Sequence, residues 1–126
     1  MQRLNAATLP ALLARHHHFC DGVIHAMTLT YVDASLHGAI RLEVMDQDAA
    51  SGWTTLELIL EGAAWVQVRE GPPTNVVMSP FGVHIEFWQD TICLDFSPVT
   101  DVDYTMADFK RSTFAVQAAV GWVVEG

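Results

Sequence analysis

Positively charged side chains are scarce in this sequence. The 126 residues include six lysines and arginines against fifteen aspartates and glutamates, so the formal net charge is −9. A chain with this balance repels the phosphates of nucleic acids and the surface of anionic membranes. We therefore expect no nucleic-acid partner and no membrane partner, and we expect a partner steered by charge to be basic.

Cysteine and long apolar runs are also nearly absent. Cys20 and Cys93 allow at most one disulfide, which excludes a disulfide-stabilised scaffold. Cys93 is out of phase with its apolar neighbours, so we expect a free structural thiol there. No apolar run approaches the roughly 20 residues that cross a bilayer, and Pro10 interrupts the N-terminal apolar stretch. We expect a cytoplasmic protein without a membrane span or a signal peptide.

Apolar residues, by contrast, are abundant. Hydrophobic side chains make up 51% of the chain and charged ones only 17%. A folded chain of this length buries roughly two-thirds of its unfolded surface, which is enough for a core without disulfides. We expect one β-rich domain over residues 1–126 rather than two lobes around a cleft.

One helix is predicted within residues 8–18. Thr8 can cap it and Pro10 is tolerated in the first turn. Its apolar face has helical spacing and consists of Leu9, Leu12, Leu13 and His16. The turn signal Asp21-Gly22 ends the helix.

After residue 22 the apolar residues alternate, which is typical of strands. The predicted strands cover residues 23–31, 40–44, 53–61, 64–69, 83–88, 92–96 and 114–124. A turn is expected at residues 35–38, and a tight hairpin across Gln89-Asp90. The apolar face of the first strand consists of Val23, His25, Met27, Leu29 and Tyr31, and that of the last consists of Phe114, Val116, Ala118, Val120, Trp122 and Val124.

Seven strands and one short helix predict an all-β fold. Hairpin connections favour antiparallel pairing in a sandwich, roll or partly open barrel, with a short N-terminal helix. Small residues on the second face of the last strand favour a central place for it. No internal helix offers a parallel crossover or a phosphate-binding N-terminus.

Three segments carry a resemblance to known proteins. They are Phe19-Cys20-Asp21-Gly22, a leucine-rich stretch at residues 56–65, and a closing strand of the Phe-x-Val-x-Ala type at residues 114–122. In this order the chain resembles a broad group of small, uncharacterised bacterial β-rich domains, some of which are immunity proteins beside toxins. Cys20 stands where the start motif of the group has a histidine. The resemblance implies binding of a toxin protein for the immunity members and no transferable catalytic residue.

The segment at residues 16–25 is the richest in possible metal ligands, which are His16, His17, His18, Cys20, Asp21 and His25. Consecutive helical side chains point about 100° apart, so three neighbouring histidines do not converge on one ion. The alternatives are a helix C-terminus that favours histidine and a hydrogen-bonded core position for His25. We expect no metal and no cofactor.

The sequence signals for a catalytic site are equally weak. The acids at Asp46 and Asp48, and those at Asp95, Asp101 and Asp103, lack the glycine, the terminal glutamate and the flanking helices of a calcium-binding loop. No Gly-x-Ser-x-Gly motif occurs. A thiol enzyme at Cys20 would draw all its groups from one short stretch, whereas such sites are assembled from separate elements. We expect a protein that is not an enzyme and has no catalytic residues.

A protein partner is the leading functional hypothesis. Aromatic residues on polar strand faces and acidic loops are typical of interfaces, and the candidate partner surface consists of Trp65, Trp88, Asp46, Asp48, Asp101 and Asp103. We expect a non-catalytic interaction module that recognises a protein through a strand face or edge; its sharper form is a toxin-neutralising, immunity-type protein. The alternative is a small-ligand-binding β domain with histidine and tryptophan in a cavity. The oligomeric state is left open, a homodimer included.

Overall fold

The computed structural model describes residues 1–69, 75–77 and 79–125. Six strands form one antiparallel sheet in the order β2-β3-β4-β7-β6-β5, and β1 pairs separately with the end of β7. The predicted β-dominated, antiparallel fold class is confirmed. The elements are β1 (Gln2–Arg3), α1 (Leu9–Arg15), the 3₁₀ turn η1 (His17–Phe19), β2 (Val23–Val32), β3 (Ser35–Met45), β4 (Trp53–Val68), β5 (His84–Trp88), β6 (Thr91–Asp95), α2 (Met106–Arg111) and β7 (Phe114–Glu125).

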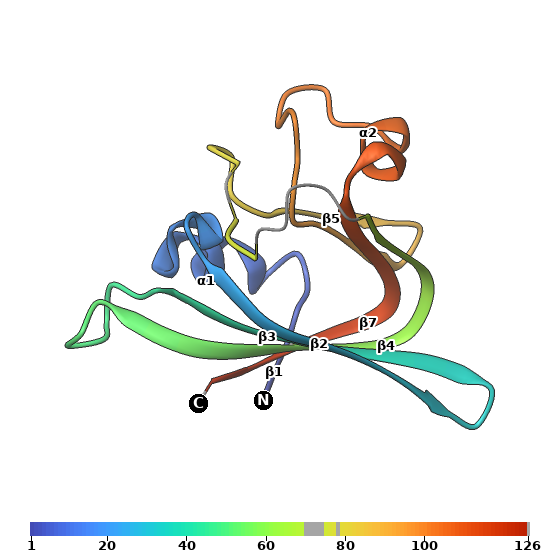
Figure 1. Ribbon diagram of the computed structural model, residues 1–126, viewed down its shortest axis with the longest axis horizontal. Coiled ribbons are helices and arrows are strands. Elements are labelled where there is room, and N and C mark those ends of the chain that lie inside the picture. Colours follow the sequence, from blue (N-terminus) through green and yellow to red (C-terminus); the bar gives the residue numbers. More distant parts are fainter. Residues whose placement is uncertain (70–74, 78, 126) are drawn as a thin grey trace.

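The sheet is strongly bent (Figure 1). In that view β2 and β3 lie in its lower part, and β4 and β7 curve upward to meet β5 and β6. α1 lies on the side toward which the sheet curves, and its Leu9 and Leu12 join the main core there. The sheet contributes to this core chiefly through Ile40, Leu42, Leu56, Leu58, Leu60, Leu94 and Val116. None of the described helices has the length and apolar character of a membrane span.

The bend lies in β4 at Gly62. This residue has a φ of +67°, a left-handed conformation that favours glycine, and a bulge follows between Ala63 and Trp65. A Cβ atom at Gly62 would lie 3.1 Å from the Cβ of Ala119 on β7. The prediction of two strands at 53–61 and 64–69 is therefore wrong, because the glycine bends one continuous strand instead of ending it.

β7 changes faces across the same bend. Before the bend, Ala118 points into the main core. After the bend, Val123 does so, although it would lie on the opposite face of a regular strand. Trp122, which alternates with Val123, donates a hydrogen bond to Glu61 on the opposite face. The predicted single apolar face over residues 114–124 is therefore wrong beyond Ala118. The central place of this strand is confirmed, since β7 lies between β4 and β6.

β2 contains a bulge just after Ile24. The extra residue shifts the alternation, so Ile24 and Met27 both pack against the main core. His25 instead lies at the surface, with its Nε2 atom 3.3 Å from Glu43 Oε2. The prediction of His25 on the apolar face is wrong for this reason.

The two hairpin turns differ in how well they were predicted. The β5–β6 turn at Gln89-Asp90 is confirmed: both residues have positive φ, and Trp88 pairs with Thr91 around them. The β2–β3 turn lies at residues 33–34 rather than at the predicted 35–38. Aspartate tolerates the left-handed φ that begins this turn better than most residues do.

Of the two described α-helices, the N-terminal one was predicted from the sequence and the second was not. α1 lies within the predicted residues 8–18, and η1 extends one residue beyond them to Phe19. The expectation of a single helix misses α2, which has a capping box at its start. There the Thr105 side chain accepts a hydrogen bond from the Asp108 amide, and Asp108 accepts one from the Thr105 amide at 2.8 Å.

Candidate functional site

The open edge of β2 is the first candidate site. β2 is the terminal strand of the sheet and pairs with β3 on one side only. Near its start, Val23 forms an isolated bridge with Val76, and the Ile24 amide donates to the Asn75 carbonyl at 2.7 Å. Within the described part of the chain, no strand pairs with the outer edge of residues 26–32. This stretch is called the β2 edge below.

The side chains of β2 do not protect this edge. The strand contains no Lys, Arg, Asp, Glu or Pro. Leu29, Tyr31 and Val32 are 48%, 74% and 51% exposed. Edge strands of natural sheets usually carry charges, proline or bulges that discourage pairing, and the bulge of β2 lies before this stretch. The β2 edge is therefore an uncharged, exposed strand edge without the usual features that discourage pairing.

The β2–β3 turn determines which backbone groups of the β2 edge are available. Only residues 33–34 separate the two strands, and Val32 pairs with Ser35 beside them. In a two-residue hairpin the pair beside the turn is hydrogen-bonded, and inward and outward groups then alternate along the strand. The N–H and C=O groups of Leu29 and Tyr31 therefore point away from β3, where an added strand would bind them.

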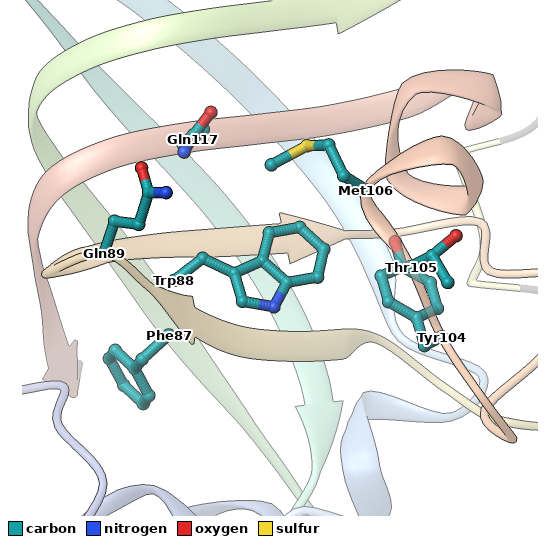
Figure 2. A pocket seen from close by; sticks show the side chains of 7 residues that line it. All are labelled: Phe87, Trp88, Gln89, Tyr104, Thr105, Met106 and Gln117. Carbon is teal, nitrogen blue, oxygen red and sulfur yellow. The ribbon is translucent and has the colours of Figure 1, made fainter.

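A groove beside Trp88 is the second candidate site. It has a volume of about 410 Å³ and lies between the β5–β6 turn and α2. Figure 2 shows Trp88 in its centre, with Gln89 and Gln117 on one side and Tyr104 and Thr105 on the other. None of the residues that line it is charged; they are Phe87, Trp88, Gln89, Tyr104, Thr105, Met106 and Gln117. We call it the Trp88 groove.

A buried carboxylate fixes Tyr104 at the wall of this groove. Asp95 is only 1% exposed and accepts hydrogen bonds from the Tyr104 hydroxyl at 2.6 Å, the Ser97 amide at 2.9 Å and the Ser112 hydroxyl. Burial, and then the hydrogen bond to Asp95, raise the pKa of Tyr104 far above its usual value. The phenol therefore stays protonated and remains a hydrogen-bond donor.

His84 and Glu86 lie next to this network. The His84 ring stacks on Tyr104 with centroids 3.8 Å apart, and its Nε2 atom is 3.4 Å from Glu86 Oε1. His84 Nε2 and Glu86 Oε2 are buried without a hydrogen-bond partner among the described residues. The Ser112 hydroxyl is bonded to Asp95 and not to His84. The arrangement therefore contains no histidine-activated serine.

The two candidate tryptophans lie in the same apolar cluster. Trp65 and Trp88 are both half-buried and pack with Phe109, the buried residue of α2. Phe109 contacts Trp88 edge-on, with ring centroids 5.9 Å apart. Lys110 places its Nζ atom 3.2 Å from the centroid of the Trp65 ring. The Trp65 ring is thus already covered by the ammonium group of Lys110, whereas Trp88 lines the Trp88 groove.

The four acids of the predicted partner surface are divided between two places. Asp101 and Asp103 are exposed in the segment that leads to Tyr104. Asp48 is exposed near Arg15, but Asp46 is only 4% exposed and binds the Arg15 guanidinium at 3.0 and 3.1 Å. That hydrogen bond lowers the pKa of Asp46. Asp46 therefore adds no exposed carboxylate to the predicted partner surface, because the ion pair with Arg15 buries it.

The histidine side chains at residues 16–18 do not point to one common site. His16 is fully buried, with its Nδ1 atom 3.0 Å from the Met45 carbonyl oxygen, while His17 and His18 are exposed. Cys20 is a half-buried free thiol. Over residues 1–69, 75–77 and 79–125, no three His, Cys, Asp or Glu side chains are grouped as metal ligands.

Several residues of the Trp88 groove were missed from the sequence, Tyr104 and Gln117 among them. A usable signal existed, since Thr105 and Asp108 have capping-box spacing and predict the helix that follows Tyr104. No comparable signal marks Gln117, because it is one residue within a long alternating strand.

Comparisons of the chain with protein-family models, with curated proteins and with solved structures find no match.

Proposed function

We propose that this protein is a non-catalytic interaction module that binds an extended segment of another protein along the β2 edge. The observation that carries the proposal is an uncharged terminal strand with exposed Leu29 and Tyr31 and outward backbone groups. An extended segment that pairs with such an edge gains main-chain hydrogen bonds, and alternate side-chain contacts supply specificity. The partner becomes one more strand of the sheet.

Charge favours a basic partner. The net charge of −9 attracts a cationic protein and repels a second copy of this chain. Asp33, at the tip of the β2–β3 hairpin, places an acid beside the β2 edge. We therefore propose a different, basic protein as the partner. Neutralisation of a bacterial toxin is the sharper form of this proposal, and a cytoplasmic location fits the two free thiols.

The geometry supports a small-ligand domain less well. That alternative requires histidine and tryptophan in one cavity, and its expected histidine was His25. His25 lies beside Glu43 at the surface and does not line the Trp88 groove. The β2 edge is therefore the better basis for a function.

Photocrosslinking in the source cell tests the proposal. A photoreactive amino acid replaces Tyr31 on the β2 edge or, as the matched control, the exposed aromatic residue Trp53 at the start of β4. We expect one basic protein to be attached at position 31 and not at position 53. Leu29→Pro, which removes an outward N–H group, should abolish this adduct.

Three outcomes contradict the proposal. Identical adducts at positions 31 and 53 mean that the β2 edge is not selective. An adduct of twice the mass of this chain means that a second copy covers the edge. An adduct that persists in the Leu29→Pro variant means that main-chain pairing does not hold the partner.

A further inference from the structure

We infer that the Trp88 groove is a second binding site, which takes the guanidinium group of an arginine side chain presented by a peptide or protein. This site goes beyond the proposed function, because it lies beside β5, at the other end of the strand order from β2. It stands or falls independently of pairing at the β2 edge.

The neighbouring tryptophan supplies the first argument. Lys110 already lies over the Trp65 ring, so an indole in this cluster binds a cation within the chain. Trp88 belongs to the same cluster, and none of the six lysines and arginines lines its groove. All six are in the described part of the chain. A cation on Trp88 must therefore come from another molecule.

The two glutamines favour guanidinium over ammonium. A guanidinium is planar, so it stacks on an indole while its N–H groups donate sideways to acceptors at the edge. The Gln117 Nε2 atom donates to Thr91 Oγ1 at 2.9 Å, and the Thr91 hydroxyl donates to the Trp88 carbonyl. This chain of bonds fixes the Gln117 amide and leaves its oxygen as an acceptor. Gln89, which is exposed, supplies a second amide on the same side of Trp88 (Figure 2).

The surrounding charge favours a cationic group. Asp90 follows Gln89 at the β5–β6 turn, and Asp101 and Asp103 lie in the segment before Tyr104; all three are exposed. The groove itself is lined by neutral residues, so an incoming cation meets no buried carboxylate that it would have to desolvate. These acids, on the segments that supply Gln89 and Tyr104, attract the cation, and the indole and amides bind it.

Titration with short peptides tests this inference. The probe is an acetylated and amidated Gly-Arg-Gly peptide, followed by the NMR signals of the tryptophan indole and glutamine side-chain N–H groups. We expect saturable shifts of Trp88 and Gln117 at peptide concentrations up to about 10 mM, since a single side chain binds in roughly the millimolar range. The same peptide with citrulline, which is neutral and of similar shape, should bind about tenfold more weakly, and the lysine peptide several-fold more weakly.

Two variants and one control locate the site. Trp88→Leu should abolish the shift of Gln117. Gln89→Ala, at an exposed position, should weaken binding several-fold without affecting folding and so keeps the test valid if Trp88→Leu unfolds the protein. Trp53→Phe, on the exposed start of β4, is the matched control and should leave binding unchanged.

Each contrary result overturns the inference. Equal binding of the citrulline peptide rules out recognition of charge, and equal binding of the lysine peptide rules out recognition of the planar group. Unaltered binding by Gln89→Ala and Trp88→Leu, or no saturable shift at all, rules out the groove itself. None of these results affects crosslinking at position 31, so failure here is distinct from failure of the proposed function.

Discussion

The two ends of the sheet are completed in opposite ways. At the β5 end, α2 and the segment before it cover one face with Phe109 and Tyr104, and the buried Asp95 binds three donors. At the β2 end, Leu29 and Tyr31 are exposed, and no described strand pairs beyond them. One end is stabilised by contacts within the chain, and the other is open to the partner strand that we propose. Substitutions of the buried residues at the β5 end should therefore change stability, and substitutions of the exposed residues at the β2 end should change binding along the β2 edge.

The largest expected effect is at Phe109. Replacing this fully buried ring with alanine in Phe109→Ala leaves a cavity under α2 and removes the edge-on contact with Trp88. We expect the free energy of unfolding to fall by about 3 to 4 kcal/mol in urea titrations followed by tryptophan fluorescence. The control Val102→Ala, in the exposed loop of the same region, should change it by less than about 0.5 kcal/mol. Equal effects would mean that α2 does not stabilise the β5 end.

Ser112→Ala should have an intermediate effect. It removes one of three hydrogen bonds to the buried Asp95 carboxylate and leaves those from Tyr104 and Ser97. We expect a loss of about 1 to 2 kcal/mol in the same urea titration, because a buried acceptor loses a donor. Ser51→Ala, in the exposed loop before β4, is the matched control and should cost less than about 0.5 kcal/mol. A loss at Ser112 no larger than at Ser51 would show that Asp95 does not depend on this donor.

The pH dependence of stability reports on Tyr104. Folding raises the pKa of Tyr104, so above the ordinary value of 10.0 the unfolded chain releases a proton that the folded chain retains. The free energy of unfolding should therefore fall as the pH rises above about 10. Tyr104→Phe should reduce this fall; Tyr31→Phe, which leaves the hydrogen bond to Asp95 in place, is the matched control. In absorbance titrations, Tyr104 should ionise only when the protein unfolds; ionisation before unfolding would contradict the buried hydrogen bond.

The smallest effect on stability is expected at the β2 edge. Tyr31→Lys adds a charge of the kind that natural edge strands carry, at a position that is 74% exposed. We expect the free energy of unfolding to change by less than about 0.5 kcal/mol while partner capture is lost. Leu36→Lys, at the half-buried partner position on β3, is the contrasting variant and should destabilise more. If the Tyr31→Lys variant still captured the partner, the β2 end would not differ from the β5 end in the way described.

The sequence predicted what depends on local alternation. The strands, the N-terminal helix and the turn at Gln89-Asp90 follow from neighbouring residues. The bend at Gly62 and the bulge after Ile24 were missed because one inserted or left-handed residue changes which face every later side chain occupies. Alternation cannot show where such a change occurs.

The candidate sites were harder to predict, because their residues meet only after folding. Asp46 is buried by Arg15, which lies far away in the sequence. Trp88 lies at a groove, but its neighbours Tyr104 and Gln117 come from two later segments. The β2 edge could be foreseen only as a generic strand edge, because its position depends on the strand order of the whole sheet.

The place of β7 also has a consequence for biosynthesis. β7 leaves the ribosome after the other strands of the sheet, yet it joins β4 to β6 in the middle of the sheet. Until then the nascent chain holds a β2–β3–β4 meander in which β4 pairs with β3 but has no strand on its other edge. Pairing over such long sequence separations is slow and leaves apolar strands exposed meanwhile. A ribosome stalled before residue 114 should therefore hold a chain that proteases cut and chaperones bind, and release of β7 should end both.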